Sequence, residues 1–273
     1  MASFLNTGAS RGFGLKLARQ LASLPATDVS RVFASARGDC PRLEEPVTES
    51  SGRLVVIKLD VTNEVSIKQA AIEVEAKLEG KGLDVLINNA GICQYAPDGV
   101  KSIFTVNVMG VHWVTRAFLP LLQKGTLKKM INISGSTSLG SITSARTFQA
   151  ISAPRYKISK TATSSLTAQY ALDYEKEGFT FMALCPGWMK TDLGGGDIAD
   201  LTLEGAKASL DIIFRPGQEL NGQLPKVFVK GWQKSKGKYQ YVGGECSMVN
   251  GCVSAFLISN LACFCSRSAE NVE

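Results

Sequence analysis

The sequence predicts a single-domain α/β fold in which a doubly wound, mainly parallel sheet of seven strands carries helices on both faces. Short apolar or β-branched runs alternate along the chain with segments of helical periodicity, an order typical of parallel sheets. The first run leads into a glycine-rich turn and then a helix. With 273 residues, 45% of them hydrophobic, the chain is long enough for one substantial core.

Composition argues against several classes of function. Lys+Arg exceed Asp+Glu by 30 − 24 = 6, but the positive charges are scattered, so we expect no nucleic-acid surface. The seven cysteines form no CxxC pair, and the single histidine, His112, has no cysteine or carboxylate pattern around it. We therefore expect no metal site, no disulfide framework and a reducing, cytoplasmic location. The first residues show no signal-like segment, and we expect no membrane association.

The glycine-rich turn follows an expected strand at residues 3–7. Gly8, Gly12 and Gly14 have the spacing G-x-x-x-G-x-G and precede a helix. Gly8 would permit the tight turn, Gly12 the approach of a pyrophosphate, and Gly14 close contact of helix and strand. The helix N-terminus would then present free N–H groups to an anion, as in Rossmann-type nucleotide sites. A plain strand-to-helix turn is the alternative.

The end of the second strand, expected at residues 31–37, indicates the cofactor. It closes in Arg37 and not in the acidic residue that binds the ribose 2′-hydroxyl in NAD-selective folds. A guanidinium suits a 2′-phosphate, and Arg11 in the glycine turn could reach the same group. We therefore expect NADP(H), although Asp39 favours the opposite choice and Arg37 could be a solvated strand end.

The remaining elements continue the alternation. The polar segment 38–52, which contains Pro41 and Pro46, is expected to be a variable connection. Asp60 comes at the carboxyl end of the third strand, the edge where ligands bind in parallel sheets, and Asn88-Asn89-Ala90-Gly91 closes the fourth. We expect further strands at 54–61, 83–88, 129–134, 179–184 and 226–229, and helices at 63–78, 103–122, 156–176 and 203–214. We place the domain at residues 1–245, followed by an atypical tail, 246–273, too polar for a membrane span.

Tyr156 and Lys160 are four residues apart and share one face of a helix. The lysine ammonium favours the phenolate and lowers the pKa of the tyrosine, so the pair can act as a general acid near neutral pH. Because Tyr-x-x-x-Lys also occurs by chance on many helices, its significance depends on the other motifs.

The glycine turn, Asp60, the motif at residues 88–91 and Tyr156-x-x-x-Lys160 occur in this order and together resemble the short-chain dehydrogenase/reductase family. The resemblance implies that Asn107 holds a water beside Lys160 and that both, with Tyr156 and a serine, are catalytic. It also implies a cofactor site formed by Gly8, Ser10, Arg11, Phe13, Gly14, Arg37, Asp60, Val61, Asn89, Gly91, Tyr156, Lys160, Met189 and Thr191.

The segment Pro186-Gly187-Trp188-Met189-Lys190-Thr191-Asp192 resembles the carbonyl-reductase branch of that family, which includes fungal ketoreductases of secondary metabolism. It implies an NADP(H)-dependent enzyme that reduces a ketone or aldehyde to an alcohol or runs the reverse reaction, with a small-molecule substrate and a homo-oligomeric state. Trp188 would line the substrate pocket or serve packing. Two alternatives remain open: an NADP-binding protein that has lost turnover, and an enzyme that uses the pocket for a non-redox step.

The catalytic serine departs from the family pattern. Measured from the fifth strand, its position falls on Gly135; measured backwards from residues 139–142, it falls near Ser136 or Thr137. A two-residue insertion explains the discrepancy. We assign the role to Ser136, because Gly135 before it can turn the hydroxyl towards the helix of Tyr156.

We predict that Ser136→Ala lowers kcat by about 10²-fold or more, the usual cost of losing one hydrogen-bond donor to a reacting oxygen. Ser134→Ala and Ser138→Ala should cost far less. Single-turnover reduction of an accepted carbonyl by the three variants checks this. A full rate for Ser136→Ala with a crippled Thr137→Val would move the role by one residue.

Overall fold

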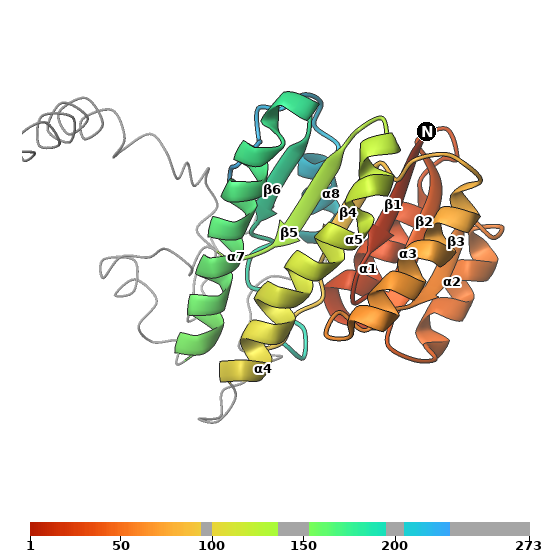
Figure 1. Ribbon diagram of the computed structural model, residues 1–273. Coiled ribbons are helices and arrows are strands. Elements are labelled where there is room, and N and C mark those ends of the chain that lie inside the picture. The colour runs from red at the N-terminus through yellow and green to blue at the C-terminus, as the bar shows by residue number, and fades with distance from the viewer. Residues whose placement is uncertain (94–99, 136–152, 195–204, 230–273) are drawn as a thin grey trace, which may run out of the picture.

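The computed structural model describes residues 1–93, 100–135, 153–194 and 205–229. In these ranges six parallel strands form one sheet in the order β3-β2-β1-β4-β5-β6. Helices α3, α5 and α7 cover one face and α1, α2 and α8 the other (Figure 1). The strand order reverses between β1 and β4, which places the switch point of this doubly wound sheet beside the glycine turn.

The α/β alternation expected from the sequence is confirmed. The strands are β1 (Ala2–Asn6), β2 (Val29–Ala36), β3 (Leu54–Lys58), β4 (Val85–Asn88), β5 (Lys129–Ile133) and β6 (Thr180–Leu184). The helices are α1 (Gly12–Ser23), α2 (Glu44–Glu49), α3 (Glu64–Leu78), α4 (Val100–Phe104), α5 (Gly110–Lys124), α7 (Pro154–Asp173) and α8 (Gly205–Ile213), with short turns η1 (Pro41–Leu43), η2 (Thr105–Met109) and η3 (Glu175–Glu177).

The seventh strand differs from the expectation. At residues 226–229 the chain forms only one isolated parallel bridge, between Lys226 and Cys185, so the described sheet has six strands. The helix expected at 103–122 is also divided, because η2 is a π turn between α4 and α5. The domain boundary at residue 245 and the tail lie outside the described residues. Within the described ranges, no helix combines the length and the apolar character needed to cross a membrane.

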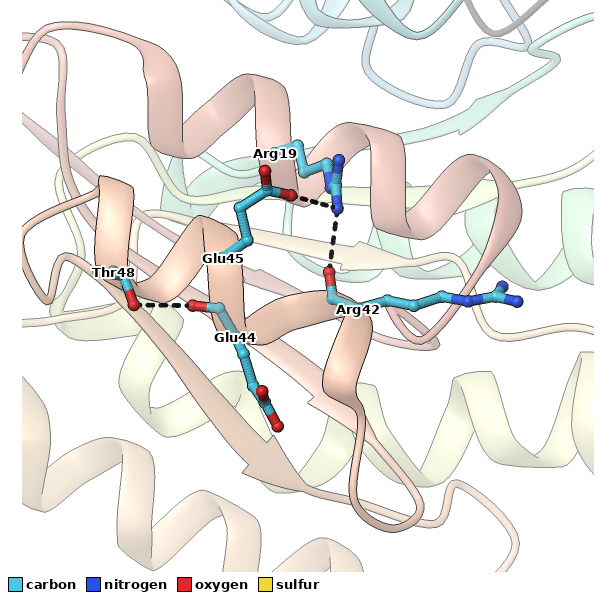
Figure 2. Close-up of polar contacts among 5 residues, drawn as sticks. All are labelled: Arg19, Arg42, Glu44, Glu45 and Thr48. Carbon is cyan, nitrogen blue, oxygen red and sulfur yellow. Dashed lines mark hydrogen bonds and ion pairs between the residues drawn. The ribbon is translucent and has the colours of Figure 1, made fainter.

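The connection at residues 38–52 contains two short helices, η1 and α2. Arg19 of α1 donates to the Arg42 carbonyl (3.2 Å) and to the Glu45 carboxylate (3.1 Å), and Figure 2 shows its guanidinium between these two acceptors. Leu43 is fully buried against the core below β2. These contacts fasten a helix of six residues that would be unstable alone. Arg19, which holds α2 in place, lies on α1 and outside the segment, so the composition of residues 38–52 alone did not predict this helix.

Helix α7 is held to the sheet through hydroxyl groups. Its buried face carries Ser159, Thr163, Ser164 and Thr167, and its apolar residues show no marked periodicity. Asn132 of β5 donates to the Thr167 hydroxyl (2.8 Å) and accepts from Asn88 of β4 (2.9 Å). A hydrogen bond fixes one geometry, whereas apolar packing tolerates sliding, so these bonds set the register of α7 against the strand ends.

Candidate active site

The glycine turn is locked to the end of β4. Gly8 has φ +69°, and a Cβ on it would lie 2.8 Å from the Ala90 Cα. A Cβ on Gly14 would overlap the Asn89 side chain and the Gly8 carbonyl. The Asn89 amide donates to the carbonyls of Thr7 (2.8 Å) and Gly8 (3.1 Å), and the Thr7 hydroxyl accepts from the N–H groups of Asn89 and Ala90. The close contact predicted for Gly14 is therefore made with Gly8 and Asn89, and neither glycine can carry a side chain here.

Arg37 and Asp60 lie where β2 and β3 end. Asp60 accepts from the N–H (2.9 Å) and the hydroxyl (2.7 Å) of Thr62. Burial alone would raise the pKa of Asp60, but these hydrogen bonds and the charge of Arg37 outweigh it and lower the pKa below its ordinary value. Arg37 and Asp60 thus lie near one another at the carboxyl-terminal edge of the sheet, close enough for the charge of Arg37 to act on Asp60.

Other predicted cofactor residues lie around this edge of the sheet. The Ser10 carbonyl accepts a weak hydrogen bond from the Cys40 thiol (3.6 Å), which joins the glycine turn to the segment after β2. Phe13 packs against the core beneath α1. Val61 lies against the start of α5, where a Cβ on Gly110 would come within 2.9 Å of its carbonyl.

The segment after β6 faces the glycine turn. A Cβ on Gly12, which has φ +56°, would lie 3.4 Å from Cγ2 of Thr191. Met189 is buried, and the Thr191 hydroxyl accepts from the Gly194 N–H (3.1 Å). Trp188 donates its indole N–H to the Gly194 carbonyl (2.7 Å). This bond gives Trp188 a structural role in closing the segment.

Tyr156 and Lys160 come together on the first turns of α7. The Lys160 Nζ is 5.6 Å from the centroid of the Tyr156 ring and donates to the Ile133 carbonyl of β5 (2.6 Å). Burial lowers the pKa of Lys160 from 10.5 to about 8, although the Cys93 thiol opposes this shift. The ammonium therefore remains mostly charged at neutral pH while it is only 4% exposed.

Asn107 lies in the π turn η2 and is fully buried. Its Oδ1 accepts from the Ile92 N–H (2.9 Å), and its amide donates to the Ile92 carbonyl and the Ser159 hydroxyl (both 3.0 Å). The main-chain carbonyl of Asn107 accepts from the Thr163 hydroxyl (2.8 Å). Oδ1 accepts one hydrogen bond here and an amide oxygen can accept two, so Asn107 keeps an acceptor site for a water. The predicted position beside Lys160 fits, because a Cβ on the intervening Gly91 would lie 3.4 Å from Asn107 and 3.6 Å from Lys160 Nζ.

The serine position is described only in part. Ser134 is buried, donates to the Lys160 carbonyl (3.1 Å) and shares a hydrogen bond with the Ser164 hydroxyl (2.8 Å). This structural use agrees with the prediction that Ser134 is not the catalytic donor. Ser136, Thr137 and Ser138 lie outside the described residues, so the assignment to Ser136 stays a prediction.

Three residues of the site escaped the sequence analysis. Thr7 was treated as part of a strand, although a hydroxyl next to a glycine turn is a signal for loop contacts. Cys93 follows the motif at residues 88–91 by two positions and affects the pKa of Lys160. Asp192 pairs with Arg11 (3.2 Å) across 181 residues, a separation at which the sequence carries no signal.

Comparison with known proteins agrees with this geometry. Residues 3–200 match the family model described as short chain dehydrogenase. The chain is 33% identical over 218 residues to the short-chain dehydrogenase anuI of Penicillium roqueforti, covering 74% of this chain and 84% of that protein. It is 32% identical over 246 residues to the short-chain dehydrogenase/reductase atnB of Arthrinium sp., covering 82% of this chain and 87% of that protein.

Two solved structures are similar over most of the described fold. The NADPH-bound carbonyl reductase from chicken fatty liver is 33% identical, with a TM-score of 0.74, and covers 83% of this chain and 96% of its own. The carbonyl reductase Sniffer of D. melanogaster is 26% identical, with a TM-score of 0.75, and covers 83% of this chain and 97% of its own.

The burial of Lys160 predicts a measurable cost in stability. Its pKa rises from about 8 in the folded protein to 10.5 in the unfolded chain, so the unfolded state binds more protons between these pH values and stability rises with pH across that window. We expect Lys160→Met to raise the free energy of unfolding at pH 7 by on the order of 1–3 kcal/mol. Urea unfolding of both proteins at pH 7, 8, 9 and 10 should show this gap narrowing above pH 8. A variant less stable than the unmodified protein at every pH would contradict the prediction.

Proposed function

Because the chain belongs to the short-chain dehydrogenase family, we propose that it is an NADP(H)-dependent oxidoreductase that reduces a ketone or aldehyde to an alcohol or catalyses the reverse reaction. The observation that carries this proposal is the buried ammonium of Lys160, 5.6 Å from the centre of the Tyr156 ring. The similarity to two carbonyl reductases supports the substrate class.

The described residues fit a dinucleotide. At Gly8 and Gly12 the backbone has positive φ, and the turn ends at the N-terminus of α1, whose first N–H groups can bind a pyrophosphate. Asp60 and Arg37 would bind the adenosine end of the cofactor, and Met189 and Thr191, in the segment that faces the glycine turn, would bind the nicotinamide end. A bound nicotinamide would supply the hydride for reduction of the carbonyl carbon.

The protein's own groups would handle the proton. Tyr156 would give its hydroxyl proton to the carbonyl oxygen as the hydride reaches the carbon. The Lys160 ammonium, charged below its pKa of about 8, would stabilise the phenolate left behind and bind the nicotinamide ribose. Asn107 would hold the water that returns a proton to the site, as the family resemblance implies. A hydroxyl at Ser136 would donate to the same carbonyl oxygen as Tyr156.

Preference for NADP(H) is supported by two guanidinium groups. Arg11 in the glycine turn and Arg37 directly after β2 are both exposed. The glycine turn is hydrogen-bonded to Ser35, near the end of β2. The chicken neighbour has NADPH bound. A cytoplasmic location, a homo-oligomeric state and a role in secondary metabolism remain proposals taken from the cysteine count and the family resemblance.

A second candidate, an NADP-binding protein without turnover, is favoured by one observation. The residue directly after Ser134 is Gly135, which has no hydroxyl, and the Ser134 hydroxyl is used by Lys160 and Ser164. Oxidation of NADPH in the presence of a panel of ketones and aldehydes separates this candidate, and any non-redox enzyme, from a carbonyl reductase.

We expect Tyr156→Phe to lower turnover by at least about 10²-fold, because the proton donor is lost, while the affinity for NADPH changes by less than about twofold. Rates of NADPH oxidation and cofactor titrations check this. Tyr170→Phe on the same helix is the matched control, since its hydroxyl contacts His112 (2.9 Å) and lies outside the proposed mechanism. Turnover of Tyr156→Phe equal to that of Tyr170→Phe would refute the assignment.

We further expect Arg37→Asp to weaken NADPH binding by at least about tenfold and to leave NADH binding equal or stronger, because it removes an attraction for the 2′-phosphate and adds a repulsion. Isothermal titration with both cofactors measures the ratio. Arg31→Asp makes the same change in charge at the other end of β2, where Arg31 contacts the Gly52 carbonyl, and should alter the ratio little. Equal affinities of the unmodified protein for the two cofactors would exclude NADP(H) preference.

A further inference from the structure

An ion pair joins the glycine turn to the segment after β6, the two segments that would hold the ends of the cofactor. Nη1 of Arg11, the residue before α1, lies 3.2 Å from Oδ2 of Asp192 in the segment after β6. The next positions also meet, since Thr191 is the nearest neighbour of a Cβ on Gly12. Arg11 and Gly12 of the glycine turn thus lie against Asp192 and Thr191 of the segment after β6. The ion pair is therefore accompanied by close packing of the neighbouring residues.

Asp192 lies in a segment, residues 188–194, whose two ends are joined by hydrogen bonds. Trp188 donates to the Gly194 carbonyl, and Gly194 donates from its N–H to the Thr191 hydroxyl. The Gly194 Cα packs against the Met189 carbonyl so closely that a Cβ would overlap it. Asp192 therefore projects from a segment whose own bonds define its path.

The ion pair is nevertheless weak enough for Arg11 to exchange Asp192 for another anion. The side chains of Arg11 and Asp192 are 64% and 76% exposed, and the contact is made by one nitrogen of the guanidinium, Nη1. Exposed pairs of this kind contribute little stability, and an arginine has five N–H donors with which to bind a phosphate. A phosphate dianion brought to Arg11 would meet the negative charge of Asp192 at the same guanidinium.

We propose that Asp192 determines cofactor selectivity by competing with the 2′-phosphate of NADP(H) for Arg11. The inference rests on the proposed function. It adds Asp192, a residue of the segment after β6, to the groups that affect binding of the 2′-phosphate on the adenosine ribose. Binding of the phosphate draws Arg11 away from Asp192 and so loosens the tie between the glycine turn and the segment 188–194. Asp192 thereby holds the preference for NADP(H) below the value that Arg11 and Arg37 would give alone.

The test compares dissociation constants of NADPH and NADH, measured by isothermal titration on the full chain. Asp192→Asn keeps the size of the side chain and removes its charge. We expect it to tighten NADPH binding about two- to fivefold, the range of an exposed pair, and to leave NADH binding within error. Glu75→Gln is the matched control: it removes one carboxylate from the Glu75–Lys124 pair (2.9 Å) between the C-terminal ends of α3 and α5, and should change neither constant.

A double-mutant cycle identifies the partner. In an Arg11→Ala background, Asp192→Asn should no longer tighten NADPH binding, because the guanidinium for which the two anions compete is gone. An unchanged or weaker affinity of Asp192→Asn for NADPH, or an equal gain with and without Arg11, would overturn the inference. If the unmodified protein bound NADPH but turned over no carbonyl, the proposed activity would be refuted. The inference would then be decided by the NADPH affinities of the Asp192 and Arg11 variants alone. An absence of NADPH binding would overturn both.

Discussion

The close approach of the glycine turn to the end of β4 is the constraint on which the site depends. Gly8 and Gly14 leave no room for side chains, and the Asn89 amide fills the space between them. The orientation of the α1 N-terminus, and hence of its free N–H groups, follows from this contact. At the switch point of the sheet, the lack of space for a side chain sets how closely the two segments approach, and the hydrogen bonds of Asn89 then hold them together.

The same contact is connected to α7, the helix of Tyr156 and Lys160, through a short stretch of main chain and a set of hydrogen bonds. Beyond Asn89, the chain passes Gly91 to Ile92, whose N–H and carbonyl are both bound by Asn107. Asn107 in turn binds Ser159 on α7, one residue before Lys160. The path from Asn89 through Ile92 and Asn107 to Ser159 thus positions both the glycine turn and the helix of the proposed proton donor. The buried hydroxyls of α7 take the place of apolar side chains and fix the register of the helix against the sheet. The buried ammonium of Lys160 adds a further cost in stability.

The sequence predicted what depends on local patterns. The alternation of strands and helices, the glycine turn and the pairing of Tyr156 with Lys160 follow from spacing within a few residues. Contacts between distant segments were missed, since nothing near Arg11 indicates Asp192 and nothing within residues 38–52 indicates Arg19. The seventh strand was predicted from a short apolar run at residues 226–229, but only Lys226 meets a neighbouring backbone as a bridge partner. Asn107 lies near Lys160, on the other side of Gly91, but its π turn has no sequence signature that we used.

That π turn has a consequence for how the chain can change in length. A single π turn amounts to one extra residue inserted into an α-helix. The π turn absorbs that residue locally, so α5 keeps its apolar face on the sheet while the residues of the turn are displaced from α-helical positions. Removing one residue from 105–109 would restore α-helical geometry and move Asn107 away from the main chain of Ile92. Such a deletion would therefore disturb the site while leaving the core packing of α5 in place.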